Sequence, residues 1–220
     1  PAARQEIRVN GGLRSPEKRD KISTDDRYLT VPTLTPMMAT SVLIRTNYFF
    51  RSPSMTELVV RRLLIDLESP LDRHWCGDDP FRTALFNALS MSFPVGEQFF
   101  IDAVRAGFKS LPPEKQAPFQ AEVQGFVGQE ATHRRIHGLF NAHLEKHGLV
   151  NHWAPRIQQR IKLLEGTQPY HALAITAANE HFTAILAEWL LSHPEVFGNS
   201  EARLKTLWLW HSAEEAEHKN

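Results

Sequence analysis

"QEATHRRIHG", residues 129–138, carries one acid and two histidines at helical spacing. Glu130, His133 and His137 are separated by three and four residues, so they lie on one face of a helix. Phe126 and Val127 precede Glu130 by one turn, which indicates that this face looks inward. A buried carboxylate without a partner costs several kcal/mol or has to bind a proton or a cation. The rest of the chain must therefore supply a compensating charge.

A second stretch, "WHSAEEAEHK" at residues 210–219, repeats the pattern. His211, Glu215 and His218 are separated by four and three residues and again share one helical face. Leu207 and Trp208 precede His211 by one turn, so this face also looks inward. Both stretches thus carry a Glu-x-x-His pair on the buried side of a helix.

Two further apolar segments each contribute one inward acid. Glu97 has Phe93 and Ile101 on its side, and Glu180 lies one turn from Thr183 and from small alanines. The order along the chain is Glu, Glu-x-x-His, Glu, Glu-x-x-His, as if one helical hairpin had been duplicated. Four facing carboxylates without cations would repel one another. Two divalent metals resolve this, and oxygen and imidazole ligands suit iron, with manganese or zinc as alternatives.

Apolar periodicity and helix-stop signals predict an all-α protein. The expected helices cover residues 56–69, 81–109, 113–147, 153–165, 169–192 and about 200 to the last residue. Four of them are long, and the connection between 147 and 169 carries a helix of its own, which is typical of a four-helix bundle with one long crossover. Residues 1–55 are expected to form an irregular N-terminal arm, and residues 56–220 the bundle. Because His218 stands in the final turn, we expect the natural last helix to continue beyond Asn220.

Composition excludes several classes of function. The 25 basic and 25 acidic residues give a formal charge of zero without a Lys/Arg block, which argues against nucleic acid or a membrane surface as partner. Cys76 is the only cysteine, so an internal disulfide and a multi-cysteine metal site are excluded. No apolar run approaches the roughly 20 residues that span a bilayer. A cytoplasmic protein is the expectation.

The motif order resembles the ferritin-like di-iron carboxylate superfamily. More narrowly, "HWCGDDP", "NALSMSFPVGEQFF", "FVGQEATHRRIHG", "NEHFTAILAE" and "LWHSAEEAEHK" are similar to a bacterial family of predicted metal-dependent hydrolases, over about residues 50–219. The resemblance implies a ferritin-like bundle that holds two Fe ions. It also implies six ligands: Glu97, Glu130, His133, Glu180, Glu215 and His218. The family's name implies hydrolysis, for which the motifs themselves give no physical argument.

His137 and His211 depart from the plain six-ligand pattern. Each is either a seventh ligand or a hydrogen-bond donor to a carboxylate. The sequence favours the donor role for His211, because Glu214 and Glu215 lie within one turn of it. It favours His137 as the seventh ligand, since no carboxylate lies three or four residues away on its helix. The remaining histidines are expected at the surface or at helix ends, and His74, Trp75 and Cys76 in a packed loop or against a substrate.

The leading functional hypothesis is a di-iron oxidase or oxygenase that uses O₂ and an electron donor to oxidise a small organic substrate. Thr183, one turn after Glu180, is then the candidate catalytic hydroxyl, with a packing role as the alternative. The second hypothesis is a binuclear hydrolase, in which a metal-bound water of lowered pKa attacks an ester or amide. The third is a non-catalytic iron-binding or protective protein. A homodimer is expected from the superfamily.

Overall fold

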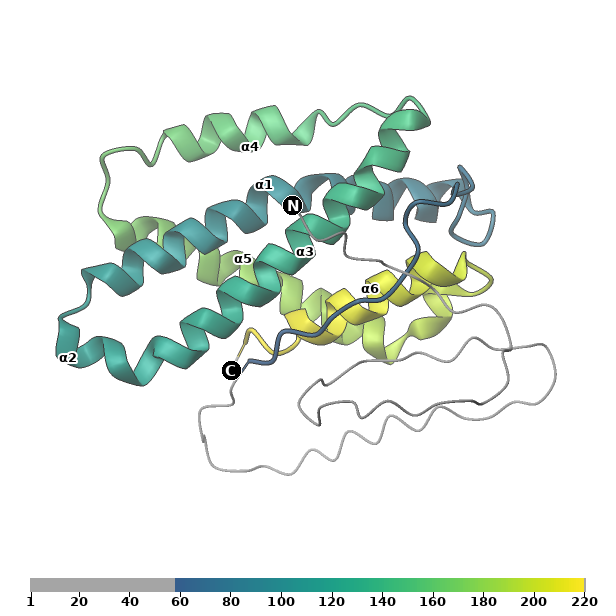
Figure 1. The fold of residues 1–220 in the computed structure, drawn as a ribbon. Coiled ribbons are helices and arrows are strands. Elements are labelled where there is room, and N and C mark those ends of the chain that lie inside the picture. Colours follow the sequence, from purple (N-terminus) through teal and green to yellow (C-terminus); the bar gives the residue numbers. More distant parts are fainter. Residues whose placement is uncertain (1–57, 220) are drawn as a thin grey trace, which may run out of the picture.

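The computed structural model describes residues 58–219, and every regular element in this range is helical. Four long helices form the bundle: α1 (Pro80–Ser110), α3 (Gln120–Lys146), α5 (Pro169–Ser192) and α6 (Ala202–Glu215). Helix α1 packs against both α3 and α5, and α5 packs against α6 (Figure 1). The predicted all-α bundle is confirmed. The predicted irregular arm falls on residues outside the described range.

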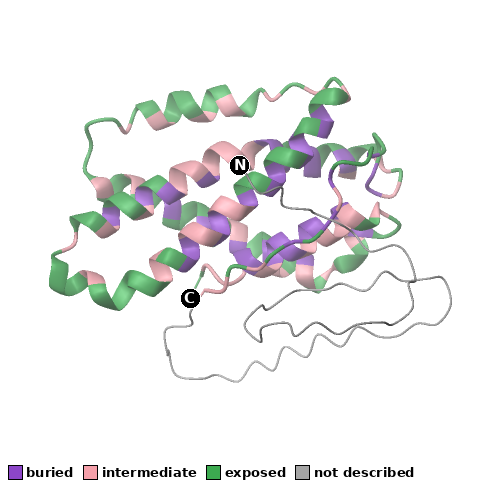
Figure 2. Cartoon of the chain, viewed as in Figure 1, coloured by how far each residue is buried: buried purple, intermediate pink, exposed green. Residues whose placement is uncertain are grey.

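The connections agree with one long crossover. Helices α1 and α3 are joined by α2 (Pro113–Gln116) and the 3₁₀ turn η1 (Ala117–Phe119), and α5 and α6 by η2 (Pro194–Phe197). The crossover from α3 to α5 contains α4 (Trp153–Lys162), which packs against α1 and has no buried residue (Figure 2). Among residues 58–219, no helix has both the length and the apolar character needed to cross a membrane.

The prediction of a helix over residues 56–69 is wrong for the part that the structure describes. Residues 58–69 form an extended strap, in which Leu63, Ile65 and Leu67 are buried and alternate with more exposed neighbours. This is the two-residue period of extended backbone. The same letters also fit a helical period, so periodicity alone could not decide between the two.

The strap (residues 58–69) lies against α3 and α6. An added Cβ at Gly125 would stand 2.6 Å from the carbonyl oxygen of Leu58, and one at Gly128 would stand 2.5 Å from a methyl carbon of Val60. These two glycines of α3 therefore permit a close approach that alanine would block. On the other side, the Arg203 guanidinium of α6 donates to the carbonyl oxygen of strap residue Asp66 at 3.0 Å.

The predicted last helix also needs a correction at its end. Helix α6 stops at Glu215, and residues 216–219 form a turn that carries His218.

Buried residues gather where α1, α3 and α6 face one another (Figure 2). At the end of the bundle near the 74–79 loop they form an apolar core that includes Trp75 and Cys76. The indole of Trp75 donates to Asn87 at 2.8 Å, which favours a packing role for this loop.

Candidate metal centre

Acids and histidines from all four long helices converge in the middle of the bundle. Glu97 comes from α1, and Glu130 and His133 come from α3. Glu180 comes from α5 and lies with its carboxylate against the turn that follows α6. The seven side chains that face the centre are at most 8% exposed: Glu97, Glu130, His133, Glu180, His211, Glu215 and His218.

Their ligand atoms divide into two groups that could each hold a metal ion. One group is formed by Glu97, His133 and His211, and within it the ligand atoms lie within 4.8 Å of one another. The same holds for the second group, which is formed by Glu130, Glu180, Glu215 and His218. The groups adjoin, because Nδ1 of His133 lies 3.6 Å from Oε1 of Glu130 and 3.3 Å from Oε1 of Glu215. Glu130 and Glu215 thus stand between the two candidate positions.

Several buried atoms of the centre have no hydrogen-bond partner within the described part of the chain. They are both oxygens of Glu97 and of Glu130, one oxygen each of Glu180 and Glu215, and Nδ1 of His133. Buried polar groups in native proteins are nearly always paired, so such a cluster needs an explanation. All of these atoms can bind a divalent cation, and two cations would also neutralise the four acids. The donor set therefore fits the two metal ions that the sequence predicts.

The electrostatics of the acids point the same way. Burial raises the pKa of Glu97 well above its usual range, raises that of Glu130, and raises that of Glu180 to about 7. Burial acts in the same direction on Glu215, but its contacts with the imidazoles of His133, His211 and His218 bring its pKa well below the usual range. Without cations, the centre therefore retains protons on some of its carboxylates near neutral pH.

Each of the three inward histidines has a hydrogen-bond partner at the ring nitrogen that points away from the four central carboxylates. Nε2 of His133 lies 2.9 Å from the Glu214 carboxylate, and Nε2 of His218 lies 3.0 Å from Oε1 of Gln129. Nδ1 of His211 lies 2.7 Å from Nε2 of His137. Outer partners of this kind orient metal-binding imidazoles and fix their tautomers.

The remaining ring nitrogens of these histidines point at carboxylates. Nδ1 of His218 lies 2.7 Å from Glu180, and Nε2 of His211 lies 2.9 Å from Glu215. Burial opposes protonation of His218, but its hydrogen bond with Glu180 and its contact with Glu215 raise its pKa to about 10. Burial lowers the pKa of His211 to about 4. One imidazole thus favours its charged form in this pocket, and the other favours its neutral form.

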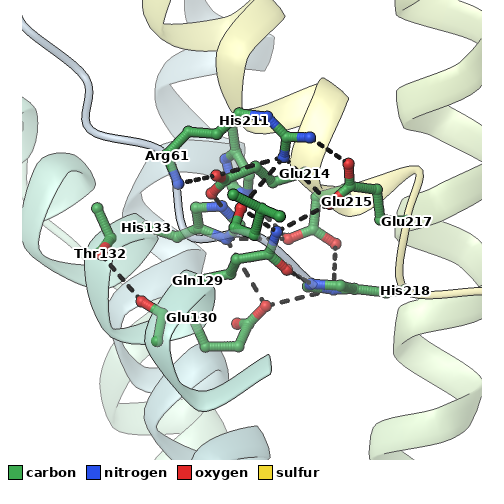
Figure 3. A network of polar contacts seen from close by, with 12 residues as sticks. Arg61, Gln129, Glu130, Thr132, His133, His211, Glu214, Glu215, Glu217 and His218 are labelled. Carbon is green, nitrogen blue, oxygen red and sulfur yellow. Dashed lines mark hydrogen bonds and ion pairs between the residues drawn. The ribbon is translucent and has the colours of Figure 1, made fainter. Parts of the chain in front are cut away.

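Arg61 of the strap supports two of these histidines from outside the bundle (Figure 3). Its backbone N–H donates to Glu214 at 2.7 Å, and its guanidinium donates to Glu217 at 3.1 Å. Glu217 in turn accepts from the Gln129 amide at 2.9 Å. Because that amide group donates, Oε1 of Gln129 is left to accept a hydrogen bond from Nε2 of His218. One extended residue therefore orders the partners of both His133 and His218.

Sequence reasoning named Glu214 only as a carboxylate within one turn of His211, and it did not identify Gln129, Arg61 or Ser90. Glu214 is fully buried, and its position three residues after His211 was a usable signal. Gln129 precedes Glu130 directly, but nothing in the neighbouring sequence identifies it as a partner of a metal-binding residue.

The structure also buries His143, which was expected near the surface, and its Nε2 meets the carbonyl oxygen of strap residue Leu67.

The structure does not bring Thr183 to the carboxylates by a hydrogen bond. Its half-buried hydroxyl lies 2.8 Å from the carbonyl oxygen of Asn179 and 3.1 Å from that of Glu180, both in its own helix. This is the usual back-bonding of threonine within a helix. Its catalytic role stays a prediction.

A protein-family model described as "Predicted metal-dependent hydrolase" matches residues 59–220. The chain belongs to this family. The match contains both candidate metal groups and the strap from Val59 onward. Searches of curated proteins and of solved structures gave no match. Family membership and the donor set agree that the protein depends on a metal.

Proposed function

We propose that the protein is a hydrolase with a two-metal centre. One position would be held by Glu97, His133 and His211, and the other by Glu180 and His218. Glu130 and Glu215 would complete the second position, where they are the members that lie beside His133 of the first. The observation that supports this most strongly is the set of buried carboxylate oxygens that have no hydrogen-bond partner among residues 58–219, in a chain that belongs to a family of predicted metal-dependent hydrolases.

Divalent ions held there would polarise an ester, amide or phosphoester and lower the pKa of water. The protein's own part is to orient the ligands and to keep water from them on the core side. Phe93 packs edge-on against the rings of His137 and His211, with ring centres 4.8 Å apart in both cases. Trp208 covers the same pair from the apolar core, at 5.3 Å from the His137 ring.

The test is to load the metal-free full chain with zinc, manganese or anaerobic ferrous iron and to measure metal content and hydrolysis of model esters, amides and phosphoesters. We expect two metal ions per chain and hydrolysis that needs no O₂. Glu130→Gln should lose both metal loading and hydrolysis, because Glu130 lies between the two positions. Glu145→Gln is the matched control, since Glu145 is exposed on the same helix. Full loading without hydrolysis of any of these classes would contradict this proposal.

A second candidate is oxidation of a small organic substrate at a di-iron centre, with O₂ and an external electron donor as partners. The observation that favours it is the ligand set itself, with four carboxylates, imidazoles and no sulfur, which suits iron or manganese. A redox-active iron pair would supply electrons to O₂. Rapid, stoichiometric O₂ consumption by the anaerobically iron-loaded protein would favour this candidate. Hydrolysis by the zinc form under nitrogen would favour the first.

A further inference from the structure

The hydrogen bond between the side chains of Ser90 and Asn141, at the edge of the centre, can have only one direction. Nδ2 of Asn141 donates to the backbone carbonyl oxygen of Ser90 at 3.0 Å, so the amide orientation is fixed. Oδ1 of Asn141 then faces the Ser90 hydroxyl at 2.6 Å and can only accept. The single hydroxyl hydrogen of Ser90 is therefore committed to Asn141.

The direction of this hydrogen bond determines which ring nitrogen of His137 carries a hydrogen. Oγ of Ser90 lies 2.8 Å from Nδ1 of His137, and because its hydrogen is already used, Oγ must accept here. His137 accordingly carries its hydrogen on Nδ1. The ring is fully buried between aromatic side chains, which disfavours a second proton. Nε2 of His137 is then a bare acceptor.

The same reasoning extends to His211. Nδ1 of His211 lies 2.7 Å from the bare Nε2 of His137 and must donate to it. In the neutral imidazole, Nε2 of His211 is then left with a lone pair, and it lies 2.9 Å from one carboxylate oxygen of Glu215 and 3.9 Å from one of Glu97. A lone pair that faces two carboxylates is repelled unless a proton or a metal cation lies between them, and a metal that binds both kinds of atom fits this position.

We propose that the Asn141–Ser90–His137 chain holds His211 in the tautomer that makes its Nε2 a metal ligand. His137 is in this proposal a positioning residue and His211 the seventh ligand, the reverse of the preference drawn from the sequence. The inference rests on the proposed two-metal centre. It also makes the two positions unequal, since the one near Glu97 has two imidazoles and only this position depends on His137.

The test compares two substitutions of His137 by zinc titration against a competing chelator. His137→Leu removes the acceptor for His211, whereas His137→Gln supplies an amide oxygen that can accept in its place. We expect His137→Leu to weaken one of the two zinc equivalents by about 10–100-fold and to leave the other unchanged. His137→Gln should recover most of the loss. His143→Gln is the matched control, because His143 is buried on the same helix and bonds to the strap instead.

Two outcomes would overturn the inference: unchanged zinc affinity in His137→Leu, or equal losses in the Leu and Gln variants. Ser90→Ala is a milder second variant, and it should weaken the same equivalent because it frees His137 to exchange tautomers. In the zinc-loaded wild-type chain, ¹⁵N NMR of labelled histidines should show a hydrogen on Nδ1 of His211. A hydrogen on Nε2 would contradict the proposed direction even if every variant folds poorly.

These measurements separate the inference from the proposed function. If the wild-type chain binds two zinc ions but hydrolyses nothing, the hydrolase proposal fails and the binding test of His137 still applies. If the wild-type chain binds fewer than two ions, the two-metal centre fails and the inference fails with it.

Discussion

The carboxylate of Glu214 lies 2.9 Å from Nε2 of His133, and both side chains are fully buried. A deprotonated carboxylate can only accept, so His133 carries a hydrogen on Nε2 and presents Nδ1 to the carboxylates of the centre. The same carboxylate accepts the backbone N–H of Arg61. Glu214 thus links the strap to a candidate metal ligand without itself facing the metal positions.

Substitution of Glu214 should separate hydrogen bonding from charge. In Glu214→Leu, the Nε2–H of His133 and the backbone N–H of Arg61 both lose their acceptor, and we expect metal affinity to fall by about 10–100-fold. Glu214→Gln retains an acceptor oxygen, so its loss should be smaller. Chelator competition with zinc measures both. Equal affinity in Glu214→Leu and the wild type would show that His133 needs no such support.

Removal of metal should destabilise the folded chain. A ligand that binds only the folded state adds RT ln(1 + [L]/Kd) to the free energy of unfolding, which is about 2.7 kcal/mol at a concentration 100 times Kd. We therefore expect the melting temperature to rise with zinc, manganese or ferrous iron and to fall again with a chelator. A melting temperature that does not respond to any of these metals would argue against their binding by the folded bundle.

Above about pH 6.5, where the buried His211 is neutral in both the folded and the unfolded chain, the metal-free protein should lose stability as pH rises. Burial raises the pKa of Glu180 to about 7 in the folded state, so the folded chain binds this proton more tightly than the unfolded chain. Its contribution is fully present below the ordinary glutamate pKa of 4.5 and is lost as pH rises through about 7. His218, whose pKa is raised to about 10, continues the loss from the ordinary histidine pKa of 6.5 upward.

This pH dependence can be measured by thermal melts in chelator between about pH 5 and 9, a window that these two shifts define. With saturating zinc the slope should become smaller, because a bound cation takes the place of the protons. Parallel curves with and without zinc would contradict the assignment of Glu180 and His218 to the centre.

The fold and the inward faces could be predicted because they depend on local spacing. Glu130 and His133 share a helical face whatever the tertiary structure, and the repeated Glu-x-x-His is visible in the letters alone. The direction of a hydrogen bond is not local in this way. The roles of His137 and His211 depend on Asn141, one turn from His137, and on Ser90 of another helix, so sequence spacing could not rank them.

The strap shows a different limit of prediction. Its apolar residues fit both an extended and a helical period, and the choice depends on what lies beside it. Two glycines of α3 provide the space, yet glycine within a helix is ordinarily only a weak helix former. Gly125 and Gly128 could be recognised as contact positions only once the strap was seen against them.

Three glycines of α3 allow this contact to be tested with a single kind of substitution. Gly125→Ala would place a Cβ 2.6 Å from the backbone oxygen of Leu58, which cannot rotate away, so the strap must shift. We expect a loss of about 1–3 kcal/mol in the free energy of unfolding, as for overpacked cores. Metal affinity should fall as well, because displacement of the strap carries Arg61 away from Glu214 and Glu217.

Gly138→Ala is the internal control for that experiment. No atom of residues 58–219 lies within 4 Å of a Cβ at this exposed position of the same helix, so alanine should be neutral or should stabilise the protein by up to about 1 kcal/mol through helix propensity. Gly128→Ala should fall between the two, since its nearest contact is a methyl of Val60 that can move. Chemical denaturation gives the three values, and zinc competition on the same samples gives the affinities. If Gly125→Ala behaves like Gly138→Ala in both measurements, the strap does not support the centre.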